Sequence, residues 1–146
     1  MKSPESNNYK KMLKLLNDPK VQAWRAVMST FEGVFELLEK QLSEQGIHIS
    51  RFLIMFHLYF EGSLSAIELA RKLRVTRGNI STFIKRLEAD DQIEICASSP
   101  SESRPKYCLT DSASADFEPI FTNHAELVKK LIPGLSKDLK AKLEKI

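Results

Sequence analysis

The stretch "LARKLRVTRGNISTFIKRL", from Leu69 to Leu87, contains six basic residues and no acidic residue. Shortly before it, Ser65 is followed three positions later by Glu68, which is the spacing of a capping box at the start of a helix. Inside the stretch, Thr76 has a side chain that is suited to cap a second helix. Two helices joined by a turn of about three residues are therefore predicted, and this is the helix-turn-helix arrangement.

The residues that follow change from helical spacing to alternation. Ile93 and Ile95 are two positions apart, and so are Tyr107 and Leu109 beyond the polar loop "SPSESRP". Alternation of apolar and polar residues predicts a strand on each side of that loop. A hairpin placed directly after the second helix predicts the wing of a winged helix-turn-helix.

Apolar residues at steps of three and four predict long helices on both sides of this segment. One covers residues 21–46, and another follows Asp111 and contains Pro119 in its first turns. The helix "RFLIMFHLYFEG", which Ser50 can cap, is apolar nearly all round and should cross the centre of the domain. A last short helix is expected after Ser136.

The predicted fold class is mainly α with a small β-hairpin, in which a winged helix-turn-helix domain is flanked by N- and C-terminal helices. We expect a polar N-terminal extension over residues 1–19 and a single domain over residues 20–146, since that length fits one domain. The winged helix-turn-helix is expected at residues 50–110, between flanking helices at residues 20–46 and 111–146.

The composition argues against several classes of protein. A net charge of +3 permits a nucleic-acid partner without requiring one, so the position of the charges matters more than their sum. No run approaches the ~18 apolar residues of a membrane span, and the initial "MKSPESNNYKK" lacks the apolar core of a signal peptide. A cytoplasmic location without a membrane partner is expected. Because no phosphate loop, nucleophile elbow or metal pair is recognisable, we expect no catalysis, no cofactor and no metal.

These motifs, taken in order, resemble the MarR (multiple antibiotic resistance regulator) family of bacterial winged helix-turn-helix transcriptional regulators. The segment "SAIELARKLRVTRGNISTFIKRLEADDQIEI" resembles the recognition segment of that family. The tripeptide "ESR" at Glu102 to Arg104 resembles its wing tip, and "CLTDSA" at Cys108 to Ala113 resembles its strand-to-helix exit. The family often has glycine where this chain has Asp91 and Ala113.

The resemblance implies a homodimer in which the N- and C-terminal helices of two chains intertwine. It also implies sequence-specific binding to a pseudo-palindromic double-stranded DNA operator, which is often relieved by a small molecule. Repression is the commoner mode of action in the family. The basic tip of the wing, at Arg104 and Lys106, would then enter the neighbouring minor groove.

The residues that could contact DNA are found by removing the apolar residues of the second helix, which are assigned to the core. The outward face that remains consists of Arg77, Gly78, Asn79, Ser81, Thr82, Lys85 and Arg86. The geometry of base edges in the major groove suits Asn79 to adenine and Arg77 to guanine. Thr76 and Ser81 suit phosphates, and the remaining basic residues of the face are candidates for further phosphate contacts. A small aromatic effector could lie between dimer helices and DNA-binding lobe, against Trp24, Phe31, Phe56 and Tyr59.

Three alternatives stay open. The basic residues can be no more than a solvated surface, and the same helix can belong to a winged-helix module that binds a protein rather than DNA. If Ile95 and Leu109 face inward as partners, Cys96 and Cys108 lie opposite each other, which permits a redox switch at the base of the wing. Two reduced cysteines of a cytoplasmic hairpin explain the same pair without any switch.

Overall fold

The computed structural model describes residues 6–97, 104–132, 141 and 144–145. The chain divides into two units, residues 1–37 and residues 38–146. The first unit contains helix α1 (Asn7–Leu16) and the greater part of helix α2 (Pro19–Glu44). Ser6 begins α1, because its side chain accepts a hydrogen bond from the backbone N–H of Tyr9 at 3.1 Å. This helix was not predicted, since only a short apolar patch interrupts the polar residues there.

The apolar side chains of the first unit are exposed. No residue from 6 to 37 is buried. Exposed large apolar residues follow helical spacing along this part of α2, at Val21, Trp24, Val27, Met28, Phe31 and Phe35. A helix face of this size and composition is ordinarily covered by another protein surface.

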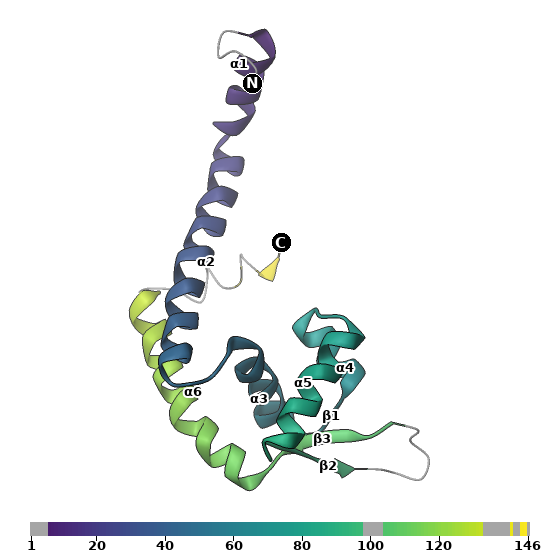
Figure 1. The fold of residues 1–146 in the computed structure, drawn as a ribbon. Coiled ribbons are helices and arrows are strands. Elements are labelled where there is room, and N and C mark those ends of the chain that lie inside the picture. Colours follow the sequence, from purple (N-terminus) through teal and green to yellow (C-terminus); the bar gives the residue numbers. More distant parts are fainter. Residues whose placement is uncertain (1–5, 98–103, 133–140, 142–143, 146) are drawn as a thin grey trace. The chain divides into compact units, whose positions relative to one another are not determined.

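The second unit contains the end of α2, four further helices and a small sheet (Figure 1). The helices are α3 (Ile49–Glu61), α4 (Ala66–Leu73), α5 (Arg77–Ala89) and α6 (Asp111–Leu131). The strands are β1 (Leu64–Ser65), β2 (Ile93–Ala97) and β3 (Lys106–Leu109), which pair antiparallel in the order β1-β3-β2. The mainly α fold with a helix-turn-helix and a wing is confirmed. Strand β1 was not predicted, because two residues are too few to show alternation.

The caps of the helix-turn-helix are as predicted. The Ser65 side chain accepts from the backbone N–H of Glu68 at 3.3 Å, and the Glu68 carboxylate accepts from the backbone N–H of Ser65 at 2.7 Å. The prediction that Ser50 caps α3 is wrong. His48 is the cap, because its backbone is extended and its Nδ1 accepts from the backbone N–H of Ser50 at 3.2 Å. Ser50 therefore lies inside the first turn.

Two apolar clusters hold the second unit together. One joins α3, α4, α5 and the sheet through Ile54, Leu58, Leu64, Leu69, Ala70, Ile80, Ile84, Leu87 and Ile93. The other joins the end of α2 and α3 to α6 through Leu42, Ile47, Phe52, Met55, Ala113 and Phe117. The first cluster fixes the position of α5, and the second fixes α6 on α3.

The register of the wing differs from the predicted pairing. Ile95 pairs with Tyr107, and Leu109 pairs with Ile93, so the expectation that Ile95 and Leu109 are partners is wrong. The partner of Cys108 is Glu94, and the register shifts between Ile95 and Ala97. A shift of this kind is a β-bulge or similar irregularity, which changes the direction of a strand. Alternation alone did not reveal it, since the extra residue breaks the period of two.

A turn links α5 to β2 and is tied to the start of α6. Asp91 has φ +57°, a left-handed conformation that glycine adopts at least cost and that aspartate tolerates. The Thr110 hydroxyl donates to the carbonyl oxygen of Asp91 at 2.8 Å and accepts from the backbone N–H of Ala113 at 3.1 Å. Thr110 therefore caps α6 and fastens the turn that follows α5.

Most of the last predicted helix, after Ser136, lies outside the described residues, of which positions 141 and 144 are helical. The wing-tip residues Glu102 and Ser103 also lie outside them. Pro119 lies inside α6, as predicted. Among the helices that the structure describes, none is long and apolar enough to span a membrane.

Candidate nucleic-acid interface

Helix α5 is anchored by one face and exposes the other. Ile80, Ile84 and Leu87 are buried in the core. The residues predicted to form the outward face are all exposed, namely Thr76, Arg77, Gly78, Asn79, Ser81, Thr82, Lys85 and Arg86. The structure therefore leaves these eight residues accessible, and their side-chain donors and acceptors suit base and phosphate recognition.

The N-terminus of α5 keeps donors available for an anion. The Thr76 side chain accepts from the backbone N–H of Asn79 at 3.2 Å, which leaves the hydroxyl hydrogen of Thr76 able to donate to a phosphate oxygen. The positive end of the helix dipole also favours an anion at this position. The cap thus orders the first turn of α5 and retains a donor beside it.

Gly78 and Thr82 lie on the same exposed face of α5. A Cβ atom added at Gly78 would meet only the Thr76 side chain, at 4.0 Å, so the packing of the protein does not itself require glycine there. The Thr82 hydroxyl donates to the carbonyl oxygen of Gly78 at 3.1 Å. Its methyl group and its oxygen lone pairs remain for a partner outside the protein.

We expect Thr76→Ala to lower the free energy of unfolding by about 1 kcal/mol, because the first turn of α5 loses its cap. Chemical denaturation measures this loss. Thr82→Ala is the matched control on the same helix and should change stability little. Its hydroxyl donates to the carbonyl oxygen of Gly78 inside the helix and satisfies no unpaired backbone N–H group, so its loss leaves no backbone donor without a partner. Equal losses in both variants would contradict the capping role of Thr76.

The described part of the wing carries two basic residues. Arg104 is exposed, and Lys106 is half-buried at the start of β3, where it pairs with Ser65 and Ala97. The pKa of the Glu68 carboxyl is lowered, chiefly by the hydrogen bond from the backbone of Ser65 and in part by the charge of Lys106. The charge of Lys106 therefore acts in part on the Glu68 carboxylate, whereas Arg104 is the more accessible of the two cations.

The predicted effector residues fall in different units. Trp24 and Phe31 are exposed in the first unit, and Phe56 and Tyr59 belong to α3 in the second. The Phe56 ring lies 5.0 Å from Phe60 and 5.9 Å from Phe121, between centroids. The Tyr59 hydroxyl donates to Glu118 at 2.8 Å, and this hydrogen bond raises the pKa of Tyr59. An aromatic cluster on α3 and α6 is thus present, and the effector pocket stays a prediction.

Cys96 and Cys108 lie close together but are not partners in the strand register, and both are free thiols. Burial raises the pKa of the Cys108 thiol to about 12, and hydrogen bonding with Cys96 adds to the effect. The Cys96 thiol also lies 3.8 Å from the carbonyl oxygen of Lys106. Because the thiolate is the reactive form, a raised pKa makes Cys108 a poor nucleophile at neutral pH, which disfavours the redox switch.

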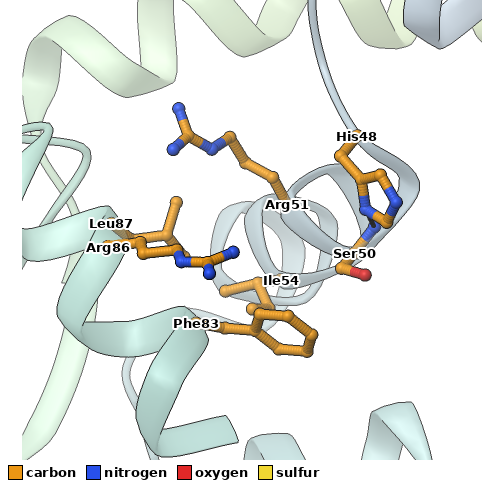
Figure 2. Close-up of a pocket in the computed structure, with 7 residues that line it drawn as sticks. All are labelled: His48, Ser50, Arg51, Ile54, Phe83, Arg86 and Leu87. Carbon is orange, nitrogen blue, oxygen red and sulfur yellow. Dashed lines mark hydrogen bonds between the residues drawn. The ribbon is translucent and has the colours of Figure 1, made fainter. Parts of the chain in front are cut away.

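Sequence reasoning missed a hollow beside α5. It is lined by His48, Ser50, Arg51 and Ile54 from the start of α3 and by Phe83, Arg86 and Leu87 from α5 (Figure 2). Arg51 forms an ion pair with Asp90, the residue that ends α5. The signal was weak because the two arginines are far apart in the chain. Within the described residues, no three His, Cys, Asp or Glu side chains form a metal site.

Comparison with known proteins agrees with this geometry. A family model described as the MarR family matches residues 47–98. Over 116 residues the chain is 25% identical to the uncharacterized HTH-type transcriptional regulator YkoM of Bacillus subtilis (strain 168), covering 79% of this chain and 75% of that protein. Among solved structures, AbsC, a MarR family transcriptional regulator from Streptomyces coelicolor, has a TM-score of 0.76 at 18% identity, covering 88% of this chain and 89% of that one. A mutant MarR from E. coli complexed with operator DNA has a TM-score of 0.69 at 21% identity, covering 90% and 94%.

Proposed function

Because the chain belongs to the MarR family of transcriptional regulators, we propose that it binds a double-stranded DNA operator as a homodimer, with α5 in the major groove. The observation that carries this proposal is the outward face of α5, whose residues are all exposed, rich in donors and without an acidic residue. It consists of Arg77, Gly78, Asn79, Ser81, Thr82, Lys85 and Arg86. The major groove admits one α-helix, and residues in its first turns reach base edges. The mutant MarR whose fold is similar was solved in complex with operator DNA, which supports DNA as the ligand.

The residues take distinct roles in this proposal. Arg77 and Asn79 read bases, while Thr76, Ser81, Lys85 and Arg86 hold phosphates. Gly78 and Thr82 permit close approach of the helix. Arg104 and Lys106 extend the contact into the adjacent minor groove.

A second copy of the chain is the partner proposed for the exposed apolar residues of the first unit. Their spacing along α1 and α2 suits a helix face that another helix covers. A two-fold dimer places its two copies of α5 about 34 Å apart, which matches one turn of DNA and a pseudo-palindromic operator. Bound across a promoter, such a dimer acts as a repressor. A small aromatic effector that alters the spacing of the two copies would release it.

Arg77→Ala tests the base-reading role. We expect it to cost about 1–3 kcal/mol of binding free energy on the preferred site and to relax specificity, because one bidentate base contact is lost. Lys85→Ala is the matched control, since losing a phosphate contact weakens all sequences alike. Gel shifts with genomic fragments and with a selected operator measure both effects. An equal loss on every sequence for Arg77→Ala would refute base reading.

A further inference from the structure

The hollow between α3 and α5 gathers two arginines from different helices over an apolar floor. It encloses about 120 Å³. Figure 2 shows Arg86 reaching from α5 toward α3 and Arg51 extending over the same hollow. Ile54, Phe83 and Leu87 supply the apolar floor. Such a combination selects a small anionic group, since guanidinium hydrogens match the oxygens of phosphate or carboxylate.

Arg51 has capacity for a ligand beyond its ion pair. Its Nη2 contacts the Asp90 carboxylate, but a guanidinium group carries five N–H donors. The side chain of Arg51 is 34% exposed, so part of it stays accessible beside the ion pair. Asp90 ends α5, and its carboxylate occupies part of the Arg51 guanidinium group, for which an incoming anion would compete.

The hollow flanks the face of α5 that is proposed to enter the groove. Arg86 belongs both to that exposed face and to the lining of the hollow. Phe83 and Leu87 line the hollow on the side of α5 that turns toward α3. A helix lying in a major groove has a phosphate backbone on each of its flanks, and contacts to it fix the position of the protein on the duplex.

We propose that Arg51 and Arg86 hold a phosphate of the DNA strand that borders the groove on the α3 side. This inference rests on the proposed function, and it adds Arg51, at the start of α3, to the DNA-binding surface. The ligand is an oxyanion of either source, a DNA phosphodiester or a free small anion. The position of Arg86 on the recognition helix favours the phosphodiester.

The first test measures binding to a selected operator and to random DNA across a range of salt concentrations. Arg51→Ala should weaken both by the same factor and should reduce the slope of log affinity against log salt by about 0.9 per protomer, the value for one lost phosphate contact. Lys130→Ala is the control, since it removes one cation from the last turn of α6, outside the hollow, and should leave the slope unchanged. An unchanged slope in Arg51→Ala, with wild-type binding intact, would overturn the phosphate contact and leave the proposed function standing. If the wild-type chain binds no DNA, the proposed function itself fails.

A second variant separates the phosphate contact from loss of the ion pair. Asp90→Ala breaks the same pair but leaves the guanidinium group, so it should keep or raise DNA affinity while thermal unfolding reports any loss of stability. A fall in affinity equal to that of Arg51→Ala would make Arg51 structural and overturn the proposal.

Titration calorimetry of the DNA-free protein with sodium phosphate and sodium benzoate tests the other source of anion. Saturable binding that Arg51→Ala abolishes, together with an unchanged salt slope on DNA, would assign the hollow to a free anion and overturn the phosphodiester contact. No saturable binding of either anion, together with the reduced slope, supports it.

Discussion

Raising the salt concentration from about 50 mM to about 200 mM should weaken operator binding by roughly 10³ to 10⁵, if the dimer neutralises about 6–10 phosphates. The physical reason is release of condensed counterions, which becomes less favourable as the salt concentration rises. Four cations of the proposed interface can lower the phosphate charge, namely Lys85, Arg86, Arg104 and Lys106, and the eight that a dimer carries lie within this range. Fluorescence anisotropy with a labelled operator fragment measures the affinity.

The matched comparison for the salt dependence is a random duplex of the same length. Its affinity should fall at least as steeply, because phosphate contacts carry no sequence information. A protein-binding winged-helix module would show no retention of either duplex at low salt. Salt-independent retention of the operator would equally contradict an interface built on these basic residues.

Phe117→Ala should lower the free energy of unfolding by roughly 3–5 kcal/mol, the range for truncating a buried phenylalanine. Phe117 is 0% exposed, and its ring lies 5.7 Å from Phe52, 5.1 Å from Tyr59 and 5.7 Å from Phe121, between centroids. The variant therefore leaves a cavity where α6 packs on α3. Urea denaturation at a fixed protomer concentration measures the loss, since the proposed dimerisation would contribute to apparent stability.

Phe60→Ala is the control for this prediction. Phe60 lies in the same aromatic cluster, 6.3 Å from Phe117 between ring centroids, but 52% of it is exposed. Its truncation removes less buried surface and leaves no enclosed cavity, so the expected loss is much smaller. If both variants lose the same free energy of unfolding, Phe117 does not have the central place in the apolar cluster of α2, α3 and α6 that its burial indicates.

Local rules were enough to predict the helix-turn-helix. Ser65, Glu68 and Thr76 satisfy backbone groups within three residues of themselves, so their effect can be inferred from spacing alone. The outward face of α5 followed from the same periodicity, because the residues assigned to the core of that helix were identified correctly at Ile80 and Ile84.

The features that were missed depend on tertiary contacts or on irregular backbone. Arg51 and Arg86 meet only because α3 packs against α5, and nothing in the local sequence of either residue records that contact. The predicted partner of Ile95 was wrong, because the register shift between Ile95 and Ala97 breaks the alternation with a period of two. The cap of α3 was placed two residues too late, because the helix begins at Ile49 and the Nδ1 of His48 accepts from the backbone N–H of Ser50.

The hydroxyl of Thr110 connects the turn after α5 to the start of α6. This residue is 8% exposed, and its single oxygen joins the carbonyl group beyond the recognition helix to the first turn of α6. In the proposed dimer, a change in the orientation of α6 would therefore act on the turn that follows α5 through these two hydrogen bonds. In the proposed complex, the angle at which α5 meets DNA would then depend on the orientation of α6.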